Sequence, residues 1–258
     1  MPMANLVEIR NIEKSYLKVG VNFGGSRVKV LNGLTFNIEE GSCVGLVGES
    51  GSGKSTLARL IMGLEKPDQG KGTILLEGQP VKQWIKNNKG KMSVVFQDYT
   101  SSVNPRYTVK EAIAEPLQAA GEKVDLNHRI EALLAKVGLE SAIKDRYPHE
   151  LSGGQLQRVC IARAIATNPR LIVLDEAISS LDVSVQSQIL KLLHQLRVEM
   201  NITYLFVSHD LQAVSHLCNK ILFLYQGKVV EELKSGQLAK AESHYARELL
   251  ASVIPFEV

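Results

Sequence analysis

Short runs of β-branched and apolar residues near the N-terminus predict a mostly antiparallel sheet. These runs cover Leu6–Ile9, Leu34–Ile38 and Thr73–Leu76, and a turn-forming PDQG sequence at 67–70 precedes the third run. Segments of this composition, bounded by turn residues, are typical of strands. The segment Lys18–Lys29 separates the first two runs and contains three glycines with little periodicity, so we expect an exposed loop there. The sequence does not indicate what this loop does.

A second pattern begins further along the chain, where apolar strands alternate with helical segments. The apolar run Cys43–Val47 leads through glycines into the helical pattern of Thr56–Leu64, and further strand-like runs lie at Leu171–Leu174 and Thr203–Val207. Alternation of strands with helices is typical of an α/β fold with a parallel sheet. We therefore predict an α/β core that the N-terminal antiparallel subdomain flanks.

The segment Thr108–Thr167 is mainly helical in pattern. Its clearest amphipathic stretch is Arg129–Val137. Four apolar residues share one face of this stretch: Ile130, Leu133, Leu134 and Val137. We interpret residues 98–168, approximately, as a helical subdomain inserted into the α/β core. Because 258 residues suffice for one large domain with a subdomain, we expect residues 1–258 to form a single domain.

Charge and hydropathy exclude several classes of protein. The 30 basic and 27 acidic residues give a net charge of +3, which is too balanced for the electrostatic surface of a nucleic-acid-binding protein. The most apolar runs, at 43–47 and 221–225, fall well short of the roughly 20 residues that cross a bilayer. Residues Met1–Asn5 lack the basic and then apolar pattern of a secretory signal, so we expect a cytosolic chain.

The three cysteines are expected to be small core residues. Cys43, Cys160 and Cys218 are scattered and have no C-x-x-C spacing. The sequence therefore indicates neither a disulfide framework nor a zinc knuckle. Cysteines without such partners are usually buried.

The sequence GESGSGKS at 48–55 fits the P-loop pattern, and it lies between an apolar strand and a helix, as the pattern requires. The glycines let successive backbone N–H groups surround phosphates, and the following helix directs its N-terminal dipole at the same anion. Lys54 would bridge the β- and γ-phosphates of ATP, and the Ser55 hydroxyl would bind Mg²⁺. We assign nucleotide binding to Gly48, Glu49, Ser50, Gly51, Ser52, Gly53, Lys54, Ser55 and Thr56.

Two adjacent acidic residues end the apolar run Leu171–Leu174. Asp175 and Glu176 follow directly, at the strand end where α/β sheets place their ligands. Asp175 would hold Mg²⁺, either directly or through water. Glu176 would point to the other side of the strand and orient or deprotonate the attacking water. Without the P-loop upstream, solvated acids at a strand end would be the better interpretation.

The segment Leu151–Gln155, which reads LSGGQ, precedes the helical run Leu156–Thr167. It can place a serine hydroxyl and glycine N–H groups at a helix N-terminus, which makes a second anion site. Two phosphate-binding loops imply a composite site. Here the chain resembles the ATP-binding cassette family, because LSGGQ is the signature of that family and lies between the P-loop and the acidic strand, as the family requires.

This resemblance implies roles for other residues that occur in the family's order. Gln97 matches the glutamine that touches Mg²⁺ and the nucleophilic water, and it is assigned to catalysis with Lys54, Glu176 and His209. His209 matches the histidine that contacts the γ-phosphate. The segment SSLD, which ends at Asp182, resembles a loop that crosses the dimer interface in the family. Tyr16 matches the aromatic residue that stacks on adenine, for which a flat apolar face suffices.

The resemblance also implies a head-to-tail dimer and a set of partners. Each ATP would lie between the P-loop of one cassette and the signature of the other, where Ser152, Gly153, Gly154 and Gln155 would touch it. Two membrane-spanning permease subunits and an extracytoplasmic substrate-binding protein complete such an assembly. A short helix of the permease would dock near Gln97–Arg106. The chain would then lie on the cytoplasmic face of the inner membrane, as a peripheral subunit.

Three classes of cassette protein are considered: the motor of a transporter, a DNA-repair or chromosome-structure ATPase, and a ribosome-associated protein. A long-armed repair protein would split its cassette with hundreds of coiled-coil residues, and the ribosomal class normally has two cassettes in one chain. This sequence shows neither feature. Most exporters fuse a membrane domain to the cassette, so a free-standing subunit of 258 residues favours an importer.

Within importers, the chain is most similar to the dipeptide, oligopeptide and nickel group. The similarity lies in Phe96–Arg106, Glu111–Leu117 and Leu151–Ala164. Peptide-transporting members usually read DEPTSALD after the apolar strand, whereas this chain reads DEAISSLD with Ala177. It also has no cysteine after Cys218, unlike many peptide-transport ATPases. We therefore expect nickel or a nickel chelate as the cargo, with a di- or oligopeptide as the alternative, and we favour a heterodimer of related ATPases.

Overall fold

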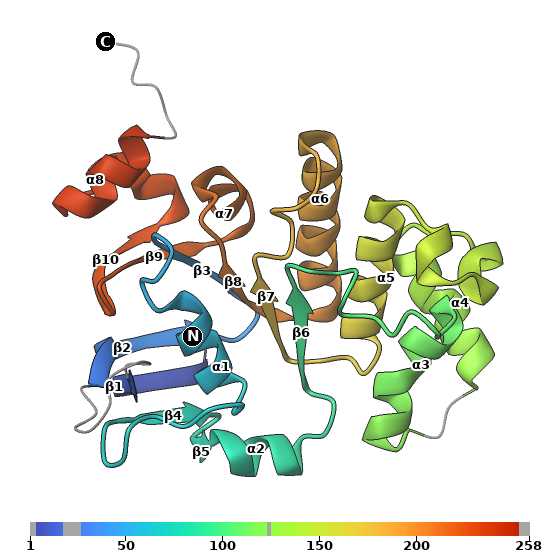
Figure 1. Ribbon diagram of the computed structural model, residues 1–258, viewed down its shortest axis with the longest axis horizontal. Coiled ribbons are helices and arrows are strands. Elements are labelled where there is room, and N and C mark those ends of the chain that lie inside the picture. Colours follow the sequence, from blue (N-terminus) through green and yellow to red (C-terminus); the bar gives the residue numbers. More distant parts are fainter. Residues whose placement is uncertain (1–3, 18–26, 123–124, 253–258) are drawn as a thin grey trace. The chain divides into compact units, whose positions relative to one another are not determined.

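The computed structural model describes residues 4–17, 27–122 and 125–252. The chain divides into two compact units, of which one comprises residues 1–84 and 205–258 and the other residues 85–204. Figure 1 shows the helices and strands of both units. The following paragraphs describe each unit by itself.

The first unit contains the predicted antiparallel sheet. Its strands are β1 (Asn5–Leu17), β2 (Arg27–Glu39), β4 (Thr73–Leu76) and β5 (Gln79–Pro80), in the order β2-β1-β4-β5. The β1 strand buries apolar side chains such as Val7 and Ile9. Both long strands extend beyond the apolar runs from which they were predicted.

The expectation of a loop over Lys18–Lys29 is wrong for its last three residues. Residues 18–26 lie outside the described part of the chain, but Arg27, Val28 and Lys29 belong to β2 and pair with Leu17, Tyr16 and Ser15. All three side chains are exposed. A strand signal was present, because residues 27–30, which read RVKV, alternate polar and apolar side chains. The loop prediction, drawn from the glycines of the segment, extended past them.

The first unit also contains a mixed sheet. The buried strand β3 (Cys43–Val47) pairs in parallel with β9 (Lys220–Tyr225), which pairs antiparallel with β10 (Lys228–Lys234). The strand β8 (Thr203–Val207) follows β3 in the strand order. The remaining elements of this unit are α1 (Lys54–Ile61), α7 (Leu211–Leu217), the 3₁₀-helix Ser235–Lys240 and α8 (His244–Ala251). The predicted parallel arrangement is therefore confirmed, with β10 as an antiparallel edge strand.

The second unit combines two parallel strands with helices. The strand β6 (Met92–Phe96) pairs in parallel with β7 (Leu171–Asp175). The helix α2 (Val81–Asn87) leads into this unit. Its other helices are α3 (Val109–Ala120), α4 (Leu126–Lys136), α5 (Gly153–Ile165) and α6 (Val183–Met200), with 3₁₀-helices at Ser141–Asp145 and Pro148–Glu150.

The helical pattern predicted between residues 108 and 167 is confirmed by α3, α4 and α5. The apolar face expected on the amphipathic stretch is buried, since Ile130, Leu133 and Leu134 are at most 1% exposed. The inserted subdomain itself remains a prediction. The fold class is confirmed: an antiparallel sheet accompanies an α/β core of the P-loop type.

The three cysteines are buried, as predicted. The sulfur atoms of Cys43 and Cys218 lie 3.0 Å apart, within hydrogen-bonding distance. Burial raises the pKa of the Cys160 thiol. These thiols therefore contribute to packing in the core.

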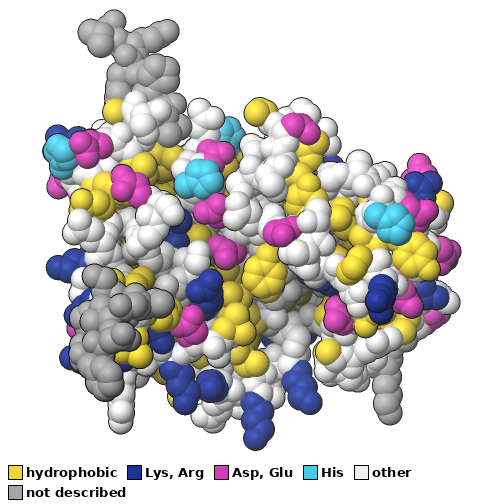
Figure 2. Space-filling model, in the orientation of Figure 1, with side chains coloured by type: hydrophobic (Ala, Val, Ile, Leu, Met, Phe, Trp, Pro, Cys, Tyr) yellow, Lys and Arg dark blue, Asp and Glu magenta, His cyan; other side chains and the backbone are white. Residues whose placement is uncertain are grey.

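The surface carries both signs of charge. Acidic and basic side chains both occur on the face that Figure 2 shows, in keeping with a net charge of only +3. Within the described residues, no helix has the length and apolar character needed to cross a membrane.

Candidate nucleotide-binding site

The P-loop, residues 48–55, connects β3 to α1 in the first unit. Its glycines are required by close approach and by backbone conformation. A Cβ atom on Gly48 would lie 2.3 Å from the carbonyl oxygen of Leu224, and Gly53 has a φ of 110° and would place a Cβ 2.6 Å from Leu31 Cδ2. Larger residues would therefore displace the loop from the strands beside it.

Lys54 is buried and its ammonium group is held by the loop itself. The side-chain Nζ donates to the carbonyl oxygen of Gly48 at 2.6 Å and to that of Glu49 at 2.9 Å. Lys54 is only 6% exposed. The loop thus keeps a positive charge beside the N-terminus of α1, where the first backbone N–H groups have no partner within the helix.

Further features of the loop fit a phosphate ligand. Within the described part of the chain, the Ser52 hydroxyl oxygen is buried and has no hydrogen-bond partner. The Ser55 side chain, by contrast, is exposed at the first turn of α1. Positive charge, a helix N-terminus and an unsatisfied hydroxyl together make a site for an anion.

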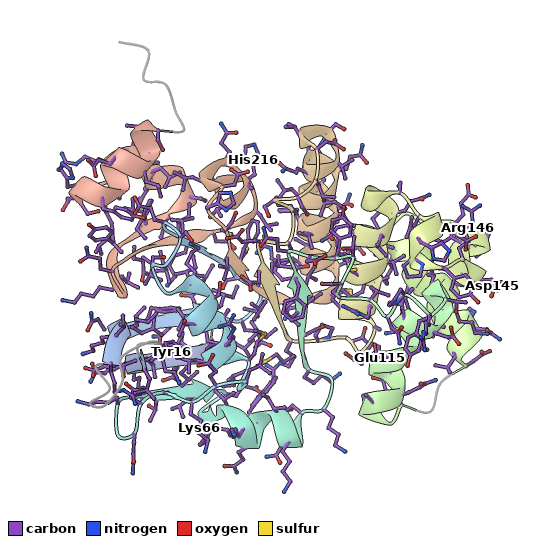
Figure 3. The ribbon with its side chains drawn as sticks, viewed as in Figure 1. Tyr16, Lys66, Glu115, Asp145, Arg146 and His216 are labelled. Atoms are coloured by element: carbon purple, nitrogen blue, oxygen red, sulfur yellow. The ribbon has the colours of Figure 1, made fainter. Side chains whose placement is uncertain are left out.

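Tyr16 and His209 also belong to the first unit. Figure 3 labels Tyr16 on β1, where its hydroxyl donates to Glu65 Oε2 at 2.6 Å and Lys14 Nζ lies 5.2 Å from the ring centroid. Burial and the hydrogen bond to Glu65 raise the pKa of Tyr16. His209 is exposed between β8 and α7, directly before Asp210, whose carboxylate caps α7. Stacking of adenine on Tyr16 and contact of His209 with the γ-phosphate remain predictions.

The second unit brings Gln97, Asp175 and Glu176 to one edge of the β6–β7 pair. The register pairs Phe96 with Asp175, so Gln97 and Glu176 are the next residues of two neighbouring parallel strands. The Gln97 carbonyl oxygen accepts hydrogen bonds from the Ser180 hydroxyl at 3.4 Å and from the Tyr99 N–H at 3.2 Å. The loops after both strands are therefore tied together near the two acidic residues.

The expectation that strand alternation directs the Glu176 side chain is wrong. The strand β7 ends at Asp175, and Glu176 has a left-handed φ of 50°. The Glu176 carbonyl oxygen accepts from the Ser179 N–H at 3.1 Å, so a turn begins at this residue. The turn sets the direction of the carboxylate, and a left-handed conformation at a residue with a Cβ costs roughly 1–2 kcal/mol.

The signature segment, residues 151–155, begins helix α5 as predicted. Ser152 is the N-cap: its hydroxyl accepts from the Gln155 N–H at 3.3 Å, and Gln155 Oε1 accepts from the Ser152 N–H at 3.0 Å. Gly153 and Gly154 are the first two residues of the helix. Ser152 and Gly153 are exposed at this N-terminus, which is thus available to a second phosphate site.

Asp182 caps the neighbouring helix α6. Its carboxylate accepts from the Val185 N–H at 3.0 Å and from the Ser184 hydroxyl at 2.8 Å. These two hydrogen bonds lower the pKa of Asp182. Asp182 is exposed, and its place at a dimer interface remains a prediction.

Sequence reasoning missed Gln157, which links α5 to the loop after β7. Its Nε2 donates to the Ala177 carbonyl oxygen at 2.6 Å, and the side chain is fully buried. The sequence contains one signal of this contact: Gln157 is a polar residue in an apolar part of the helix, next to Leu156 and close to Val159, which are both buried. A buried amide without a partner is costly, so its presence in such a stretch indicates a specific hydrogen bond.

The loop after Gln97 depends on the charge of Asp98. Its carboxylate accepts from the Thr100 hydroxyl and the Thr100 and Ser101 N–H groups, and bonds to Thr100 and Ser101 lower the pKa of Asp98 from 3.8 to about 2. A lowered pKa means that the carboxylate stabilises the folded loop above about pH 4 and that this contribution is lost as the pH falls towards 2.

We expect Asp98→Asn to loosen this loop at neutral pH. The amide lacks the negative charge that these donors favour, so the N–H groups of Thr100 and Ser101 should exchange with solvent several-fold faster. Hydrogen exchange followed by NMR measures this rate. Asp125→Asn, which changes the cap of α4, is the matched control and should leave the loop unaffected. Unchanged exchange at both amides in Asp98→Asn would contradict the role of the charge.

The site residues thus form two groups. The first unit holds Tyr16, the P-loop and His209, while the second holds Gln97, Asp175, Glu176, the signature segment and Asp182. Within each group the predicted residues lie on the elements expected for them. That both groups act on one nucleotide remains a prediction.

Comparison with known proteins agrees with this geometry. A family model described as ABC transporter matches residues 31–179. The chain is 43% identical over 253 residues to the metal-staphylopine import system ATP-binding protein CntF of Staphylococcus aureus, covering 97% of this chain and all of that protein. It is 43% identical to the nickel import ATP-binding protein NikE of Rhodospirillum rubrum, covering 98% of this chain and 93% of that one. Other relatives are named oligopeptide transport ATP-binding proteins.

A solved structure gives the same result for the fold. The dimeric structure of a post-hydrolysis state of the ATP-binding cassette MJ0796, bound to ADP and Pi, superimposes with a TM-score of 0.76. The two sequences are 31% identical, and the match covers 89% of this chain and 98% of that one.

Proposed function

Because this chain belongs to the ATP-binding cassette transporter family, we propose that it drives the import of nickel ions or a nickel chelate by hydrolysing ATP. At the coarser level the chain is the ATPase subunit of an importer for nickel, metal-staphylopine or oligopeptides. The observation that carries the proposal is that one chain contains both a P-loop lysine held at a helix N-terminus and a signature helix capped by serine.

The chain binds ATP, and the P-loop residues suit its phosphates. Lys54 provides the charge for the β- and γ-phosphates, and the loop and α1 provide N–H donors. We further propose that Ser55, Gln97 and Asp175 supply oxygen ligands, which Mg²⁺ prefers. Magnesium, when bound, neutralises charge that develops on the phosphates during transfer.

The proposed hydrolysis uses four side chains. Glu176 accepts a proton from water as the water oxygen bonds to the γ-phosphorus, and the bond from that phosphorus to the β–γ bridging oxygen breaks to leave ADP. Gln97 orients the water from the neighbouring strand end. His209 contacts the γ-phosphate, and Lys54 stabilises its negative charge.

The proposed assembly is a dimer of cassettes on two permease subunits. ATP would lie between the P-loop of one cassette and Ser152, Gly154 and Gln155 of the other, so that ATP binding closes the dimer and hydrolysis reopens it. The MJ0796 relative is dimeric in its ADP and Pi complex, which supports this arrangement. We propose that the second cassette is a related ATPase and that an extracytoplasmic binding protein delivers the cargo. The chain would lie on the cytoplasmic face of the inner membrane.

The alternative cargo is a di- or oligopeptide. Relatives with oligopeptide transport in their names support it. The residue Ala177, where peptide transporters usually have proline, favours nickel, as does the name of NikE. The name of CntF, a metal-staphylopine import protein, supports a chelated metal as the cargo. A DNA- or ribosome-directed ATPase is disfavoured by the balanced charge.

Uptake of radiolabelled nickel by cells carrying the whole transporter tests the cargo. Nickel is offered alone, with a small chelator, or with excess dipeptide, to cells with the wild type, Lys54→Ala or the exposed-site control Lys86→Ala. We expect uptake that requires Lys54, persists in Lys86→Ala and is unaffected by dipeptide. Lys54-dependent uptake of labelled dipeptide without nickel uptake would overturn the cargo assignment. Uptake of either cargo that does not depend on Lys54 would contradict the role of this chain as the motor.

A further inference from the structure

The C-terminal helix α8 reaches the P-loop through Tyr245. The Tyr245 hydroxyl oxygen accepts a hydrogen bond from the backbone N–H of Glu49 at 2.8 Å, although the two residues are separated by 196 positions in the sequence. Both belong to the first unit. None of the phosphate, metal or water contacts proposed above uses this tyrosine.

Tyr245 is held in place from two sides. Its ring lies against the ring of Tyr225, the last residue of β9, with centroids 4.5 Å apart. The start of α8 is fastened to β10, because the Glu231 carboxylate accepts from the Glu242 N–H at 2.8 Å and the Ser243 N–H at 2.9 Å. The hydroxyl is therefore directed at the P-loop by the sheet that carries the loop.

The peptide unit that Tyr245 contacts also holds the catalytic lysine. The N–H of Glu49 and the carbonyl group of Gly48 belong to the same planar peptide. Tyr245 binds its N–H, and Lys54 Nζ binds its carbonyl oxygen at 2.6 Å. Rotation of this peptide would break both hydrogen bonds, and a hydrogen bond at one end of a peptide strengthens the bond at the other.

We propose that Tyr245 is a positioning residue for the nucleotide: it fixes the Gly48–Glu49 peptide and thereby places the Lys54 ammonium group. The inference rests on the proposed binding of ATP at the P-loop and extends control of that site to α8. Tyr245 does not touch the nucleotide itself. Burial raises the pKa of Tyr245, so its hydroxyl stays neutral at physiological pH and suits a backbone N–H donor.

The test compares Tyr245→Phe with Tyr225→Phe in the purified full-length chain. Both changes remove one hydroxyl from the same pair of neighbouring rings, which are tilted by 33°, and keep both rings. The Tyr225 hydroxyl contacts the Gln226 side chain at 3.2 Å, whereas the Tyr245 hydroxyl contacts the P-loop. The paired design therefore separates loss of the P-loop hydrogen bond from general effects of removing a buried or exposed hydroxyl.

We expect Tyr245→Phe to raise both the KM of hydrolysis and the Kd for ATP about threefold to tenfold, the range expected when one neutral hydrogen bond is lost. The kcat should change less than twofold, and the Glu49 amide should exchange faster with solvent. Tyr225→Phe should match the wild type in all of these. Melting temperatures of both variants confirm that the chain is folded.

The outcomes distinguish the inference from the proposed function. If the wild type hydrolyses ATP and the two variants share its KM, Kd and Glu49 exchange rate, Tyr245 has no positioning role. If Tyr245→Phe lowers kcat and leaves KM unchanged, the hydroxyl does not act through nucleotide binding, and the inference is also overturned. A folded wild type that neither binds nor hydrolyses ATP would overturn the proposed function, and with it this inference.

Discussion

Lys54→Ala is expected to abolish productive ATP handling. The substitution removes the only side chain assigned to both the β- and γ-phosphates, and loss of one such stabilising group from an active site costs roughly a hundredfold or more in rate. The ammonium group is already buried against the Gly48 and Glu49 carbonyl oxygens. A phosphate-release assay on the purified protein, with ATP varied, measures the loss in kcat/KM.

The exposed Lys86→Ala serves as the matched control for this experiment, because it removes the same charge from the surface of α2. It should hydrolyse ATP at the wild-type rate. Circular dichroism and the melting temperature show whether Lys54→Ala retains the fold. Hydrolysis by a folded Lys54→Ala at a rate near that of the wild type would exclude the proposed phosphate contact.

The parts of the site that the sequence predicts well are local ones. The P-loop could be predicted because strand, glycines, lysine and helix follow one another within about a dozen residues. The Ser152 cap could be predicted because Ser152 and Gln155 make a capping box within a single turn. In both cases a short run of neighbouring residues determines its own conformation, without contacts to distant parts of the chain.

Two local predictions failed at the ends of strands. At Arg27–Lys29, the exposed first residues of β2 pair with β1 and alternate with Val30 in polarity, but the loop prediction followed the nearby glycines and extended over them. At Glu176 the chain leaves β7 and enters a turn with φ of 50°. Because β7 ends at Asp175, the alternation of side chains across a strand does not extend to the Glu176 carboxylate.

The partners in long-range contacts could not be predicted, for a different reason. The hydrogen bond between Tyr245 and Glu49 joins the C-terminal helix to the P-loop, and that between Gln157 and Ala177 joins α5 to the loop after β7. Each joins a side chain to a backbone group. Because every residue except proline offers an N–H group and every residue offers a carbonyl group, the sequence carries no mark of the partner.

The contact at Ala177 also bears on the cargo. Ala177 is buried, and its carbonyl oxygen accepts the hydrogen bond from Gln157. A carbonyl group is present whether this residue is alanine or the proline usual in peptide transporters. The residue that favours nickel by resemblance thus packs inside the ATPase subunit, so it identifies relatives and does not itself select a cargo. This location agrees with the proposal that other subunits of the assembly select the cargo.

Glu176→Gln is expected to separate ATP binding from hydrolysis. Glutamine keeps the size and shape of glutamate but cannot accept the proton of the attacking water, and general-base catalysis of this kind contributes about 10²–10⁴-fold. The P-loop contacts are unchanged, so the Kd for ATP should remain within about twofold of the wild type. If ATP closes the dimer as proposed, Glu176→Gln with ATP should accumulate as dimer, which light scattering after gel filtration measures.

Glu199→Gln provides the same chemical change at an exposed position of α6, where the carboxylate pairs only at the surface with Lys136. Such a pair contributes little to stability, so this variant should hydrolyse ATP as the wild type does and should not accumulate dimers. A partner ATPase, if required for closure, is added equally to every sample. Rapid turnover by Glu176→Gln would exclude Glu176 as the base. Slow turnover with no ATP-dependent dimer would support Glu176 as the base but contradict the proposed site between two cassettes. In that proposal, the nucleotide held between the cassettes links hydrolysis to opening of the dimer.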